Sequence, residues 1–213
     1  MSNEESNDIL DMIINNNLCN NEIPKKTQVY INCSGKSGSQ TLLNTLKQYY
    51  KCLHCHGNWY FQNKIIKNTD INLYDCIKKS MEHYEDVYVI DSYRTPFERA
   101  ISASFQNNPD TTLENFNYNL IINENYDCFD ETIVNFDLEK LEYFDFEKKY
   151  MEIKYKNLHI IKIRFSDIHN WDKILSNIFK RNINIITNNL SSVKYYYNNY
   201  KNLLHLWTFK TPN

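Results

Sequence analysis

Residues 28 to 42 read QVYINCSGKSGSQTL, and this stretch decides how the rest of the sequence is interpreted. Its first six residues alternate in polarity and are rich in β-forming types, so they predict a strand. Gly35 and Gly38 then interrupt the pattern, and from Leu42 onward apolar residues recur at helical spacing. In a chain with only 3 glycines, two of them lie where a tight backbone cradle would need them. The stretch predicts a strand, a glycine-containing loop and a helix.

The same alternation continues along the chain. Further strands are predicted at 51–55, 86–91 and 158–163, and helical patterns separate or follow them. Such alternation is typical of a parallel sheet with right-handed crossovers, in which ligands bind outside the carboxyl ends of the strands. We therefore expect an α/β fold of three layers, with a central parallel sheet flanked by helices.

Two segments are harder to interpret. Residues 107–152 are acidic and aromatic, and we expect them to form helices that cover one side of the sheet. Ser166 and Asp167 are predicted to cap a helix that follows the last strand, and a final helix is expected from about 191 to 206.

Composition favours one domain. The chain has 213 residues, of which 42% are hydrophobic, and this is enough for one sizeable core. Residues 1–26 are polar and Asn-rich, so we interpret them as an extension with one short helix at 9–14, and residues 27–213 as the domain. The net charge of −2 gives no global attraction to nucleic acid.

No segment has the features of a transmembrane helix or a signal peptide, so we expect a soluble, cytoplasmic protein. The six cysteines are then interpreted as reduced thiols and not as a disulfide framework. The oligomeric state is left open by the sequence.

The loop after the first predicted strand has the chemistry of an anion site. It offers consecutive backbone amides, several hydroxyls and Lys36, all at the start of a helix whose N-terminus carries partial positive charge. The triphosphate-binding Walker pattern does not fit, because it needs a glycine where the chain has Tyr30.

The loop resembles the donor loop of sulfotransferases that use PAPS, the 3′-phosphorylated adenosine phosphosulfate. In that family a lysine is followed by a small residue, a glycine, two small or hydroxyl residues and a helix. Gln40 stands where the family usually has a small or hydroxyl residue. The resemblance implies a fold like that of P-loop NTPases, with Lys36 as the chief electrophilic catalyst. It also implies donor binding by Ser34, Gly35, Lys36, Ser37, Gly38, Ser39, Gln40 and Thr41.

A second motif after the predicted strand at 86–91 resembles the other signature of this family. The family has Arg, any residue, Pro, two residues, Arg, two residues and Ser, and here these are Arg94, Pro96, Arg99 and Ser102. In the family the first Arg and the Ser hold the 3′-phosphate of PAPS, so the resemblance assigns this role to Arg94 and Ser102. The segment at 189–204 resembles the end of carbohydrate sulfotransferases and favours a glycan hydroxyl as the acceptor.

Transfer to a hydroxyl is helped by a group that accepts its proton, and histidine suits this near neutral pH. His54 and His56 lie on the same side of the strand at 51–55 and its end, so either is a candidate base, and His56 is slightly favoured by its place beside Gly57. Glu98 and Asp91 remain alternatives. No metal is required, and the nearby cysteines and histidines cannot all converge on one zinc ion.

Two other classes of function stay open. The hydrophobic strand that ends at Asp91 also fits an ATP-dependent kinase or a related triphosphate enzyme with a magnesium-binding Asp. A non-catalytic nucleotide-binding or structural protein on the same fold is the second alternative.

Overall fold

The structure is a computed structural model that describes residues 26–67, 70–112, 114–117, 127–141, 143–186 and 197–208. Nearly all of the polar extension expected at 1–26, including its short helix, lies outside these ranges. The first strand begins at Thr27.

A five-stranded sheet forms the centre of the molecule, with the strand order β2-β1-β3-β5-β4. Four strands run parallel to one another: β1 (Thr27–Asn32), β2 (Lys51–Cys55), β3 (Asp86–Tyr93) and β5 (Leu158–Arg164). These are the four strands predicted from the sequence, so the α/β class is confirmed.

The fifth strand corrects two expectations. β4 (Tyr150–Tyr155) pairs antiparallel with β5, so the sheet is mostly and not wholly parallel. It also lies in the segment that was expected to be helical, where the only helix among the described residues is α7 (Cys128–Asn135). The helical expectation failed because Met151 and Ile153 alternate with polar residues, and both pack against the core.

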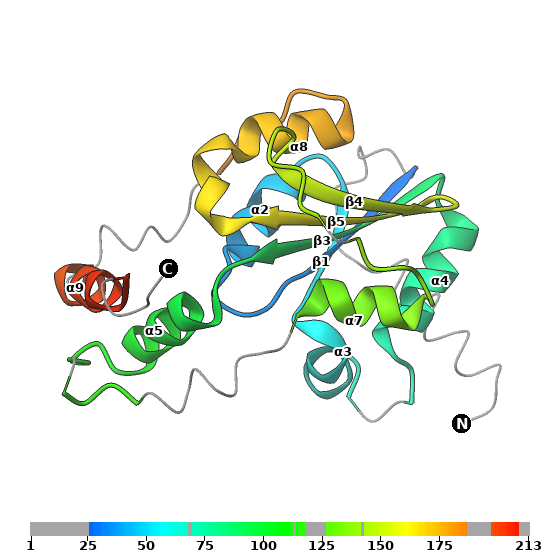
Figure 1. Ribbon diagram of the computed structural model, residues 1–213. Coiled ribbons are helices and arrows are strands. Elements are labelled where there is room, and N and C mark those ends of the chain that lie inside the picture. The colour runs from blue at the N-terminus through cyan, green and yellow to red at the C-terminus, as the bar shows by residue number, and fades with distance from the viewer. Residues whose placement is uncertain are drawn as a thin grey trace.

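Helices cover both faces of the sheet (Figure 1). On one face lie α2 (Ser39–Leu46) and α8 (Trp171–Phe179). On the other face lie α3 (Gly57–Tyr60), the π-helical turn η1 (Phe61–Ile65), α4 (Leu73–His83) and α7. Two further helices, α5 (Pro96–Asn107) and α9 (Tyr197–Thr208), lie beyond the carboxyl edge of the parallel strands.

The strand pleat divides the core in two. Along β1, Tyr30 packs in the cluster under α4 and α7, whereas Val29 and Ile31 pack in the cluster under α2 and α8. A third, smaller cluster joins α5 to α9 and contains Phe105 and Leu203. The core is therefore large on both faces of the sheet and small where α9 is attached.

The caps of the later helices differ from the expectation. Ser166 and Asp167 lie inside a 3-10 helix, η2 (Phe165–Asn170), and the residue before α8 is Asn170. The cap prediction was wrong because Arg164 binds the Asp167 carboxylate at 2.6 Å, which draws that side chain back toward β5. The final helix, expected from about 191 to 206, is α9, which the structure describes over Tyr197–Thr208, and its expected start lies outside the described residues.

Among the described residues, no helix has the length and apolar character needed to cross a bilayer. No disulfide joins the cysteines of the described ranges.

Candidate functional site

The β1–α2 loop, residues 33–38, turns at Gly38. This glycine adopts φ 87°, in the left-handed region that favours glycine. A Cβ at this position would lie 2.8 Å from the Trp171 ring and 3.0 Å from the Phe165 ring. Gly38 therefore lets the loop pass directly over two aromatic side chains, whereas a Cβ at Gly35 would meet nothing within 4 Å. Of the two loop glycines, only Gly38 is required by its surroundings.

The start of α2 presents unused amides. Within the described ranges, the backbone amides of Ser37, Gly38, Ser39 and Gln40 donate no hydrogen bond. Such amides at the N-terminus of an eight-residue helix form a binding surface for an anion. These amides are the part of the predicted anion site that has no protein acceptor within the described ranges.

Most hydroxyl side chains of the loop are buried, so they offer less to an anion than the backbone amides do. Ser37 is buried and donates from Oγ to the Ser34 carbonyl at 2.6 Å, so it braces the loop from inside. Ser34, Ser39 and Thr41 are also buried. Gln40 is exposed, and its side-chain amide donates from Nε2 to Oδ1 of Asn44 at 3.3 Å.

The two motifs that are far apart in sequence meet in space. β1 and β3 are neighbours in the sheet, so the loop after β1 and the turn after β3 lie at the same edge. Arg94 donates from Nη1 to the Lys36 carbonyl at 2.9 Å. Lys36 itself has φ 65°, so the loop also passes through a left-handed residue here. The Arg94 side chain is therefore in contact with the backbone of Lys36.

Arg94 is buried and held on several sides. Its guanidinium lies over the Phe165 ring, with the Arg94 Cζ 4.4 Å from the ring centroid. Nη2 donates to the hydroxyl of Tyr200, and Nε lies 3.9 Å from a Glu98 carboxylate oxygen. Nε has no hydrogen-bond acceptor within the described ranges.

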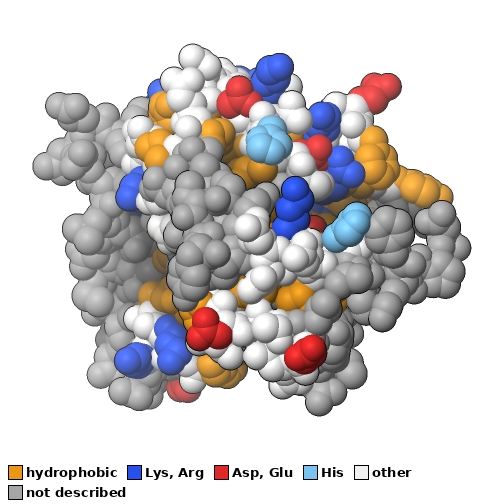
Figure 2. All heavy atoms as spheres, turned by 90° about the vertical axis from the view of Figure 1, so that its left-hand side faces the viewer, with side chains coloured by type: hydrophobic (Ala, Val, Ile, Leu, Met, Phe, Trp, Pro, Cys, Tyr) orange, Lys and Arg blue, Asp and Glu red, His pale blue; other side chains and the backbone are white. Residues whose placement is uncertain are grey.

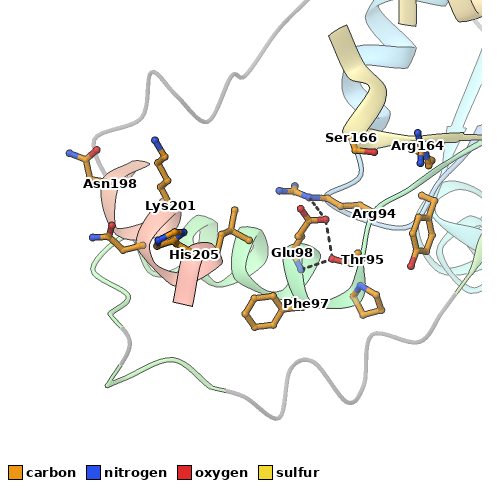
Figure 3. A pocket seen from close by; sticks show the side chains of 13 residues that line it. Arg94, Thr95, Phe97, Glu98, Arg164, Ser166, Asn198, Lys201 and His205 are labelled. Atoms are coloured by element: carbon orange, nitrogen blue, oxygen red, sulfur yellow. Dashed lines mark hydrogen bonds and ion pairs between the residues drawn. The ribbon is translucent and has the colours of Figure 1, made fainter. Parts of the chain in front are cut away.

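A cavity of about 1450 Å³ opens beside Arg94 (Figure 3). It lies between the start of α5, the end of β5 and α9, and its charged lining comprises Arg94, Glu98, Arg164, Lys201 and His205. Cationic groups outnumber the single carboxylate, so the cavity suits an anionic ligand. The face of the molecule at this edge mixes basic, acidic, histidine and hydrophobic side chains in its upper part (Figure 2).

Ser102 makes no direct hydrogen bond to Arg94 within the described ranges. It lies in α5 and is half-buried. The cavity lining includes Arg94 but neither Ser102 nor Lys36. Arg99, the other basic residue of the motif, is buried.

The two histidines lie beside the loop. The His54 and His56 rings are 4.7 Å apart, so both face the same side as expected. His56 Nδ1 lies 2.6 Å from the Cys33 carbonyl oxygen. Since a carbonyl can only accept, Nδ1 carries the proton, and in the neutral ring Nε2 is the nitrogen that can accept one. Burial, with a smaller contribution from His56, lowers the pKa of His54 to about 4, which makes His54 the weaker base.

Asp91 at the end of β3 is enclosed. It is 3% exposed, and one carboxylate oxygen has no hydrogen-bond partner within the described ranges. Burial first and the Asp127 carboxylate second raise the pKa of Asp91 to about 7, although Lys162 acts in the opposite direction. Lys162 forms its close ion pair with Asp127 instead, at 2.6 Å. Asp91 therefore lacks the exposure that a metal ligand or an external base would need.

Sequence reasoning missed Tyr200 and Phe165, and it interpreted Trp171 only as a core residue of the helix after the last strand. Tyr200 stands 106 positions after Arg94, and no local pattern links the two. Phe165 and Trp171 follow β5, which lies on the other side of β3 from the loop, and only the strand order brings them under Gly38. The one available signal was the apolar helical spacing that placed Trp171 in the core.

Comparisons of this chain with protein-family models, with curated protein sequences and with solved structures found no match.

Proposed function

We propose that this chain is a PAPS-dependent sulfotransferase on a P-loop-like α/β fold, and that it transfers a sulfuryl group to a hydroxyl acceptor, in particular a glycan. The observation that carries the proposal is the 2.9 Å hydrogen bond from Arg94 to the Lys36 carbonyl. It joins the two motifs that resemble the donor-binding motifs of that family. A ligand with anionic groups at both ends would contact the two motifs together.

The residues present fit such a donor. The unused amides from Ser37 to Gln40, with Lys36 beside them, suit a phosphosulfate. An arginine has five N–H donors, and Arg94 uses one at each Nη. The remaining three are enough for a phosphate, and a guanidinium binds such an oxygen pair well.

When bound, the donor supplies a sulfuryl group attached to its 5′-phosphate. Lys36 would stabilise the negative charge that develops on the departing nucleotide, at the N-terminus of α2. His56 would take the acceptor hydroxyl's proton at Nε2 while the acceptor oxygen bonds to sulfur and the bond from sulfur to the phosphate oxygen breaks. The products are the sulfate ester and 3′,5′-ADP.

The first experiment measures the melting temperature of the purified protein with 3′,5′-ADP, ATP or 5′-AMP. A ligand that binds only the folded state adds about 2.7 kcal/mol at a hundredfold excess over its Kd. We expect a clear rise with 3′,5′-ADP only. The rise should be lost in Arg94→Ala and Lys36→Ala, and kept in Lys47→Ala, which removes an exposed lysine after the same helix.

A rise with ATP alone would refute the proposal and favour a triphosphate enzyme. No rise with any nucleotide would refute it as well. A rise with 3′,5′-ADP without sulfate transfer to glycan, phenol or peptide acceptors would instead support a non-catalytic nucleotide-binding protein.

A second experiment tests the assigned base. Replacing His56 in His56→Gln should lower the rate of sulfate transfer by about 10²–10⁴-fold, the usual contribution of a positioned base. Binding of 3′,5′-ADP, measured by calorimetry, should not change. His54→Gln is the matched control and should lower the rate less, since the pKa of His54 is already near 4. Equal losses in both variants would contradict the assignment.

A further inference from the structure

Arg94 is oriented by a residue from the far end of the chain. Tyr200 lies on α9, is 7% exposed, and accepts a hydrogen bond at its hydroxyl from Arg94 Nη2. Its ring also lies near the cation, with the Arg94 Cζ 6.0 Å from the ring centroid. Tyr200 is thus the contact through which α9 reaches the candidate nucleotide site.

Three contacts from three segments fix the guanidinium plane. The Lys36 carbonyl holds Nη1, the Tyr200 hydroxyl holds Nη2, and the Phe165 ring lies against the face. A planar group held at two edges and one face has a single orientation. Its remaining donors are therefore pre-oriented at the edge of the cavity that Arg94 lines.

A competing partner lies close by. The Glu98 carboxylate is 3.9 Å from Arg94 Nε, and its side chain is 39% exposed. Without the Tyr200 hydroxyl, Nη2 would lose its acceptor, and an unsatisfied buried guanidinium would turn toward the nearest carboxylate. Tyr200 opposes this movement because its hydroxyl holds Nη2 in place.

Tyr200 itself is fixed by packing. Its ring meets Phe105 of α5 edge to face, with centroids 6.0 Å apart, inside the small α5–α9 cluster. The hydroxyl is therefore held in place by contacts that do not involve Arg94, which makes Phe105 useful for a control.

We propose that Tyr200 is a positioning residue for Arg94 and that it sets the selectivity of this protein for nucleotides that carry a 3′-phosphate. This inference rests on the proposed function, since it assumes that Arg94 binds that phosphate. The selectivity would come from the fixed direction of the Arg94 N–H groups that the Lys36 carbonyl and the Tyr200 hydroxyl do not use.

The test is the ratio of affinities for 3′,5′-ADP and 5′-AMP, measured by calorimetry on the full chain. In Tyr200→Phe we expect about a tenfold loss of 3′,5′-ADP affinity, the scale of one charge-assisted hydrogen bond, with 5′-AMP affinity nearly unchanged. In Tyr200→Phe/Glu98→Gln the ratio should recover, because the competing charge is gone.

Controls separate positioning from folding. Phe105→Leu loosens the packing of Tyr200 but keeps its hydroxyl, so the ratio of the two affinities should fall less than in Tyr200→Phe. A wild-type ratio in Tyr200→Phe would overturn the inference and leave the proposed function standing. A wild-type protein that does not prefer 3′,5′-ADP would overturn both.

Discussion

At the scale of single residues, the two loop glycines have different roles. Gly38→Ala would place a Cβ in a left-handed backbone and against Trp171, which is fully buried. We expect it to lower the free energy of unfolding by about 2–5 kcal/mol, from backbone strain and overpacking together. Gly35→Ala has open space and should change it by less than about 0.5 kcal/mol. Urea denaturation of both variants measures the difference, and equal effects would contradict this account.

Asp91 makes stability depend on pH. Its pKa is raised to about 7 in the folded protein, so between about pH 4 and pH 7 the folded state holds a proton that the unfolded state has lost. The contribution of Asp91 to stability therefore falls as pH rises through this range and is constant above it. A shift of this size corresponds to about 4 kcal/mol.

The variant that tests this is Asp91→Asn, which cannot titrate. We expect the stability of the variant relative to the wild type to increase from pH 4 to pH 8 by up to about 4 kcal/mol. Denaturant unfolding at several pH values gives this difference directly. A difference that does not change with pH would show that the carboxyl of Asp91 is not perturbed.

At the scale of elements, α5 is the helix that begins beside Arg94. Thr95 caps it: its hydroxyl accepts from the Glu98 amide at 3.3 Å and donates to the Glu98 carboxylate at 2.9 Å. Thr95→Ala should lower the free energy of unfolding by about 0.5–2 kcal/mol through the lost cap. Thr95→Ser keeps the hydroxyl and is the matched control, so an equal loss in both variants would argue against capping as the cause.

At the scale of the whole molecule, the two large cores lie on the faces of the sheet, and the hydrophobic cluster that includes α9 is the small one with α5. Few buried contacts mean easier local opening. We expect the amides of α9 to exchange with deuterium faster than those of β1, β3 and β5. Addition of 3′,5′-ADP should slow exchange in α9 by about tenfold or more, since binding stabilises the closed site. If the exchange rates of the α9 amides did not change when 3′,5′-ADP binds, α9 would not be part of the nucleotide site.

The strands and the loop could be predicted from the sequence because their signals are local. The β-rich alternation of 28–33, the glycine spacing after it and the Pro at the start of α5 each depend on neighbouring residues. The antiparallel β4 was missed because its short alternation lies in an acidic, aromatic segment that also resembles a helix.

The sequence by itself determined the α/β class, the four parallel strands and the position of the two motifs at strand ends. Only the tertiary structure decided that Gly38, and not Gly35, is sterically required, that the cavity beside Arg94 is not lined by Ser102, and that Tyr200 holds the guanidinium. The physical reason is range: strand and turn preferences act between neighbours, whereas these contacts depend on the strand order and on where α9 packs.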